Sequence, residues 1–225
     1  MASAGPISVV IVFHSAYRGS TAALAEAIAR GAASVEDVTT TMVSVDEVDD
    51  HWETLHRADA LVFGSPTYVG SVSAAFKAFI ERLAGDVWLE RMWLNKVAGG
   101  FTVSSGPSGD KLNTLQDLAI FAAQLGMIWV PVRQIGGHYA TTTSIDEAVN
   151  RMGAYLGVMA QANIDEAPPL APPPSDVLTA ELHGEHIATI ARQLAAGRAK
   201  HPSPYPDRAW RTGRPLTLFD RGLTE

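Results

Sequence analysis

The 225-residue chain contains no cysteine, which excludes disulfides, thiolate metal sites and cysteine nucleophiles. No apolar run approaches the roughly 20 residues that a membrane-spanning helix requires. The first residues, MASAGP, lack the charged and apolar regions of a signal peptide. We therefore expect a cytoplasmic protein that has no membrane partner.

Several nucleotide-binding and catalytic signatures are also missing. The sequence has no G-x-x-x-x-G-K-[ST] motif, and no two of its glycines are spaced as G-x-G. Any nicotinamide must therefore bind transiently over another cofactor. There is no G-x-S-x-G elbow. His183 and His186 flank Glu185 without forming H-E-x-x-H, so we interpret them as exposed positions on a helix and expect no metal site.

Positive charge is scarce except at the end of the chain. The net charge of −7 argues against nucleic acid as a partner. Residues 198–225, however, contain six Arg/Lys and only three Asp/Glu. This Pro/Arg-rich arm either docks on the acidic body or on a neighbouring subunit, or it is solvated.

What the chain does contain is a regular alternation of strand-like and helix-like segments. Apolar, β-branched runs predict five strands, at residues 7–13, 38–45, 60–64, 97–103 and 127–132. Helical spacing of apolar residues predicts helices at 22–30 (ending at Gly31), around 76–83, from Asp110 through Leu112, Leu115, Ala119 and Ala122, and at 175–196. A turn at Gly136-Gly137-His138 is expected to lead into a further helix, at about 138–162. The prolines of 168–174 predict a stiff extended connector.

This alternation indicates parallel right-handed β-α-β units. We predict an α/β fold, a doubly wound three-layer sandwich around a five-stranded parallel sheet of order 2-1-3-4-5. Residues 1–197 are expected to form one domain, followed by the arm at 198–225.

A ligand site is expected beyond the carboxyl ends of strands 1, 3 and 4, where the strand order reverses. The loop after strand 1 leads into a helix N-terminus, whose amides and dipole favour a phosphate, although a plain helix cap would look the same. The loops after strands 3 and 4 are suited to holding a flat ring by its edges. The candidate residues are Ser15, Ala16, Tyr17, Arg18, Gly19, Ser20 and Thr21 in the first loop, Pro66, Thr67, Tyr68, Val69 and Gly70 in the second, and Ser104, Ser105, Gly106, Pro107, Ser108 and Gly109 in the third.

Three segments carry a resemblance to a known family: FHSAYRGSTAALAEAIARG, GSPTYVGSVSAAFKAFIERL, and VSSGPSGDKLNTLQDL followed by LGMIWVPV. Over residues 7–197 the chain resembles flavodoxin-like FMN proteins, and most closely the tryptophan-repressor-binding-protein type of NAD(P)H:quinone oxidoreductase. The resemblance implies FMN phosphate on the first loop and the isoalloxazine ring between the second and third. It also implies NAD(P)H as co-substrate, a quinone-like acceptor, and a homo-oligomer, either dimer or tetramer.

The resemblance further implies that Tyr17 lies near the nicotinamide and Trp88 in the acceptor pocket, although Trp88 equally suits core or subunit packing. Two positions depart from the family pattern. Arg18 is an apparent insertion in the first loop, and Gln124 replaces a ring-contacting histidine. Because the flavin carries the chemistry, no side chain is assigned a catalytic role.

The activity implied is a two-electron reduction by hydride transfer through flavin N5. Three alternatives remain open. They are a one-electron carrier of the flavodoxin type, an FMN-free oligomeric binding protein, and a reductase of flavin, azo or metal acceptors.

Overall fold

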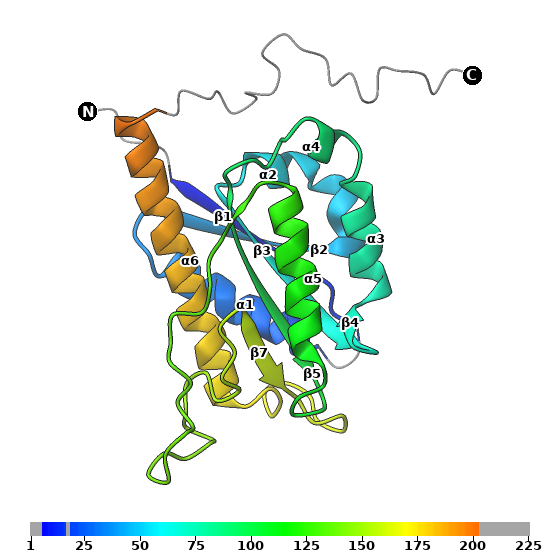
Figure 1. Ribbon diagram of the computed structural model, residues 1–225, viewed down its shortest axis with the longest axis vertical. Coiled ribbons are helices and arrows are strands. Elements are labelled where there is room, and N and C mark those ends of the chain that lie inside the picture. The colour runs from blue at the N-terminus through cyan, green and yellow to red at the C-terminus, as the bar shows by residue number, and fades with distance from the viewer. Residues whose placement is uncertain (1–5, 17–18, 203–225) are drawn as a thin grey trace.

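The computed structural model describes residues 6–16 and 19–202, which form a three-layer α/β sandwich (Figure 1). The main path of the sheet runs β2-β1-β3-β5-β6, and its paired neighbours are parallel. This is the predicted 2-1-3-4-5 order, so the fold prediction is confirmed. The strands are β1 (Ile7–Phe13), β2 (Val38–Ser44), β3 (Ala60–Tyr68), β4 (Ser71–Val72), β5 (Val97–Ser104), β6 (Ile128–Trp129) and β7 (Val158–Gln161).

Helices cover both faces of the sheet (Figure 1). They are α1 (Ser20–Ala33), a 3₁₀ helix (Val45–Asp50), α2 (Trp52–Arg57), α3 (Ala74–Arg82), α4 (Asp86–Leu89), α5 (Lys111–Gln124) and α6 (Pro174–Lys200). Because side chains alternate along a strand, β1 supplies Val9 and Ile11 to the core under α1 and α6. It supplies Val10 and Val12 to the core under α3 and α5. The almost continuously apolar sequence of β1 therefore does reflect burial on both faces.

Helices α1 and α6 pack unusually close together. A Cβ added at Gly31 would lie 1.8 Å from the Glu181 carbonyl oxygen, and one at Gly184 would lie 2.1 Å from that of Ile28. The prediction that Gly31 ends the first helix is wrong, because α1 continues to Ala33. A glycine is needed at position 31 because a neighbouring helix approaches closely, and not because the helix ends there.

The helix predicted at about 138–162 does not exist. Between β6 and β7 the chain forms turns and irregular segments, and β7 then pairs in parallel with the carboxyl half of β5. The fifth strand predicted at 127–132 is reduced to the two residues of β6, which pair with the amino half of β5. Pro131 has no amide hydrogen to continue that ladder, so a second segment completes this edge.

The C-terminal third departs from prediction in three further ways. The segment 168–174 forms turns, with cis bonds at Pro168–Pro169 and Ala171–Pro172, and is not an extended connector. His183 was predicted to be exposed but is fully buried, because α6 presents it to the sheet. Leu112 was predicted to face the core but is exposed, whereas the next turn of α5 buries Leu115 and Leu118.

The boundary predicted at residue 197 falls inside α6, which runs to Lys200. Residues 203–225 lie outside the described part of the chain, so the Pro/Arg-rich arm stays a prediction.

Candidate functional site

The carboxyl ends of β1, β3 and β5 meet at one edge of the sheet. Phe13 pairs with Gly64, and Pro66 pairs with Val103, so the loops that follow these strands begin side by side. The tertiary structure thus brings together the first, second and third candidate loops, as the strand order required.

The first loop joins β1 to the N-terminus of α1. Of its candidate residues, Tyr17 and Arg18 lie outside the described residues. Gly19 is the N-cap residue with a φ of 78°, and no atom of the other described residues lies within 4 Å of the position where its Cβ would be, its chain neighbours aside. The Ser15 hydroxyl accepts a hydrogen bond from the Ala22 amide at 3.2 Å, so Ser15 supplies the cap.

His14 also belongs to this loop, although no sequence pattern indicated it. Its backbone amide donates to the Gly64 carbonyl at 3.0 Å, which fixes the residue at the carboxyl end of β1. Its Nδ1 is buried and has no hydrogen-bond partner among the described residues. A buried, unpaired ring nitrogen costs about 1–3 kcal/mol. A lone histidine after a strand belongs to no motif, so only the fold reveals it.

The second loop is the tip of a β-hairpin and not an irregular loop. Strand β3 continues through Tyr68 and turns back into β4, with Thr67 opposite Val72. The two residues of the turn, Val69 and Gly70, have φ angles of 50° and 82°. Positive φ at both central residues is the pattern of a type I′ turn. The hairpin projects Tyr68, which is 44% exposed, and Val69, which is fully exposed.

A buried threonine network holds this hairpin in place. Thr67 Oγ1 lies 2.8 Å from the Oγ1 atoms of both Thr102 and Thr114, on β5 and α5. The hydroxyl of Thr67 is therefore used in hydrogen bonds within the protein. Tyr68, Val69 and the backbone remain available to contact a ligand.

The third loop closes around a buried lysine that sequence reasoning missed. Lys111 is fully buried, and its ammonium donates to Ser104 Oγ at 3.0 Å, to the Gly106 carbonyl at 2.7 Å and to the Pro107 carbonyl at 3.0 Å. Burial lowers the pKa of Lys111 to about 8. Asp110 stands at the predicted cap position, but its side chain makes no capping hydrogen bond.

Further hydrogen bonds join the loops to each other and to β7. Asn113 Nδ2 donates to the Gly70 carbonyl at 2.8 Å, which ties the hairpin tip to α5 just after the third loop. Gln161 Nε2 donates to the Ser105 carbonyl at 3.0 Å, so β7 supports the third loop from the other side. The second and third loops are therefore one connected framework.

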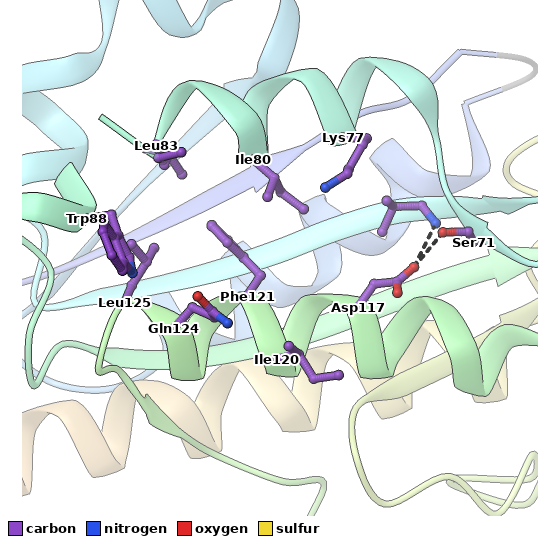
Figure 2. Close-up of a pocket in the computed structure, with 12 residues that line it drawn as sticks. Ser71, Lys77, Ile80, Leu83, Trp88, Asp117, Ile120, Phe121, Gln124 and Leu125 are labelled. Carbon is purple, nitrogen blue, oxygen red and sulfur yellow. Dashed lines mark hydrogen bonds between the residues drawn. The ribbon is translucent and has the colours of Figure 1, made fainter. Parts of the chain in front are cut away.

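Trp88 and Gln124 lie in a different place. They share a groove of about 520 Å³ between α3, α4 and α5 (Figure 2). Ser71 and Asp117 occupy one end of it, where Ser71 Oγ donates to the carboxylate at 2.5 Å, and Trp88, Gln124 and Leu125 lie at the other end. Within one chain this groove adjoins the hairpin through Ser71, but it places Trp88 away from the three loops.

Comparison with known proteins identifies the family of the chain. Residues 8–142 match the family model described as NADPH-dependent FMN reductase. The chain belongs to this family, whose fold is flavodoxin-like. Flavodoxin FldP of Pseudomonas aeruginosa is 34% identical over 194 residues, covering 83% of this chain and 98% of that protein.

Two other relatives of this FMN reductase family are informative. A protein of Aromatoleum aromaticum named NAD(P)H dehydrogenase (quinone) is 28% identical over 86% of this chain and 100% of its own length. The crystal structure of a WrbA-like flavodoxin from Agrobacterium tumefaciens aligns with a TM-score of 0.63 and 35% identity, covering 83% of this chain and 98% of the other. In residues 6–16 and 19–202 of the present member, no helix is long and apolar enough to cross a membrane.

Val69, at the tip of the hairpin, has a strained backbone conformation. A β-branched residue at positive φ is a conformational outlier that costs roughly 1–2 kcal/mol. Asparagine tolerates this backbone conformation, so we expect Val69→Asn to raise the free energy of unfolding by about 1 kcal/mol, measured by urea denaturation. Val69→Ala, which keeps the strained φ, should gain less. Equal effects of the two variants would contradict the assignment of strain.

Proposed function

We propose that this chain binds FMN at the three loops and reduces quinone-like acceptors with hydride from NAD(P)H. The observation that carries the proposal is the convergence of three loops, rich in hydroxyl groups and glycine, at the edge of the sheet where the strand order reverses. Membership of the NADPH-dependent FMN reductase family supports the same cofactor.

The residues present fit FMN. Gly19 is the N-cap of a 14-residue helix, and no described residue beyond its chain neighbours fills the position of a Cβ there, which suits a phosphate dianion. The hairpin tip and the third loop would hold the isoalloxazine by its edges, with Tyr68 and Val69 excluding water from it.

When bound, FMN supplies the hydride-accepting chemistry, and the protein orients and tunes it. Ser15 holds the first turn of α1 in place through its cap, so the amides of this turn keep a fixed direction toward a phosphate. The threonine network and the Asn113 contact hold the hairpin rigid against α5. Trp88 is proposed to contact the acceptor from its groove, and the homo-oligomer and the cytoplasmic location stay predictions.

One specific observation favours a second candidate function. The relative that is 34% identical is named a flavodoxin, so a one-electron carrier is the alternative. The two functions share the cofactor and differ in whether NAD(P)H is turned over.

Binding is tested by comparing FMN with riboflavin, which lacks the phosphate. We expect the parent protein to bind FMN more tightly than riboflavin by flavin fluorescence titration. In Gly19→Asp the added carboxylate lies at the proposed phosphate position, so FMN affinity should fall roughly tenfold or more while riboflavin affinity changes little. Asparagine-like residues tolerate this αL backbone, so the variant should still fold.

Gly85→Asp is the matched control, because Gly85 is also an N-cap glycine with no atom within 4 Å, at α4. It should leave FMN affinity unchanged. Absence of FMN binding by the parent would contradict the cofactor assignment. Oxidation of NADH or NADPH in the presence of benzoquinone then separates the two functions, since a one-electron carrier binds FMN without turnover.

A further inference from the structure

Lys111 lies beneath the third loop of the candidate site, and its positive charge has no ion-pair partner among the described residues. Its ammonium is fully buried, and all three of its protons are donated to neutral oxygens of the third loop. Among the described residues, no ion pair involves Lys111. A buried cation without a counter-charge costs several kcal/mol, so a negative partner supplied from outside the chain would complete it.

The acidic group whose charge acts on Lys111, Asp176, does not fill this role. Asp176 raises the pKa of Lys111, but Arg151 lowers it. Arg151 donates to both carboxylate oxygens of Asp176 at 2.8 Å, and the Gln161 amide donates to the same carboxylate at 2.9 Å. The charge of Asp176 is thus balanced by its own arginine, which leaves one unbalanced positive charge inside the loop.

The lysine also decides which way the loop backbone points. In a trans peptide the carbonyl and the following N–H lie on opposite sides. Because the Pro107 carbonyl faces Lys111, the Ser108 N–H points away from it and toward the outside of the loop. The loop is tightly closed, since a Cβ at Gly109 would lie 2.1 Å from Ser104 Oγ.

We propose that Lys111 is a positioning residue for the flavin: it shapes the loop from within and supplies the positive charge that stabilises the reduced ring. The inference rests on the proposed function. Hydride transfer from NAD(P)H brings two electrons and one proton to FMN, releases NAD(P)⁺ and leaves the ring with one added negative charge. Lys111 acts on that charge through the loop and donates none of its protons to the ring.

The test measures the two-electron midpoint potential of the bound FMN and its dissociation constant. In Lys111→Met the reduced cofactor should lose about tenfold more affinity than the oxidised one, which makes the potential about 30 mV more negative. Lys111→Gln keeps N–H donors for the loop carbonyls but removes the charge. It should show the same shift in potential with a smaller loss of stability, and it serves as the test if Lys111→Met fails to fold.

Lys96→Met is the matched control. Lys96 also donates to backbone carbonyls, those of His56 and Ala58, but it lies just before β5, at the opposite edge of the sheet. This variant should lower stability and leave the potential unchanged.

The outcomes separate this inference from the proposed function. An unchanged potential in both Lys111 variants, or an equal shift in Lys96→Met, would overturn the inference alone. Loss of FMN affinity with an unchanged potential would also overturn it, because the charge would then act on the phosphate. If the parent protein binds no FMN, the proposed function is wrong and the inference falls with it.

Discussion

Gly184→Ala is expected to lower the free energy of unfolding by about 3 kcal/mol, a large effect for one added methyl group. The added Cβ would lie 2.1 Å from the Ile28 carbonyl oxygen. That oxygen belongs to the backbone of α1, so it moves only if the two helices separate. Separation would loosen the core beneath them, which includes Leu24, Ile28 and Ile187.

The same helix offers a matched control. Gly197 also lies in α6, but no atom of the described residues beyond its own helix and chain neighbours lies within 4 Å of the position where its Cβ would be. Gly197→Ala should therefore stabilise the protein by roughly 0.5–1 kcal/mol, because alanine loses less backbone entropy in a helix. Urea denaturation followed by circular dichroism measures both variants. Similar effects from the two substitutions would show that the close helix contact is not present in solution.

The second large effect is a loss of stability in mild acid caused by His183. Among the described residues, neither ring nitrogen of this fully buried side chain has a hydrogen-bond partner. Burial, with a smaller contribution from His186, lowers the pKa of His183 from 6.5 to about 3. Between these two values the unfolded chain holds a proton that the folded chain does not. Stability therefore falls as the pH drops below about 6.5, by about 2 kcal/mol between pH 7 and pH 5.

Replacement by an apolar residue should remove this dependence. His183→Leu is expected to flatten the stability profile between pH 7 and pH 5. It should also be at least as stable as the parent at pH 7, because no unpaired nitrogen remains buried. His186→Gln is the control, since His186 is on the same helix but half-buried, and it should keep most of the acid sensitivity. An unchanged pH profile in His183→Leu would rule out His183 as the cause.

The order of the sheet followed from local patterns. The apolar run of β1 and the alternation with helices were enough, because a parallel β-α-β chain has few permitted topologies. The loops after β1, β3 and β5 were then fixed at one edge by topology. The helix expected at 138–162 does not form, because the end of this segment is β7, which pairs with a strand more than 50 residues earlier.

Single residues were harder to interpret than segments. The local sequence predicts that Gly31 ends a helix. Only the approach of α6 shows that Gly31 is a packing contact. Val69 was predicted to lie in a loop, and only the pairing of β3 with β4 shows that it occupies a strained turn.

The sequence by itself determined the family, the doubly wound sheet and the three loops. The periodicity of apolar residues and the positions of glycine-rich segments are local properties of the chain. Only the tertiary structure decided that His14 and His183 are left with unpaired nitrogens and that Lys111 is buried beneath the third loop. Burial and hydrogen bonding depend on which distant segment covers a residue. For Lys111 these partners are backbone carbonyls brought around its ammonium by the closed loop, and no pattern in the order of the residues records them.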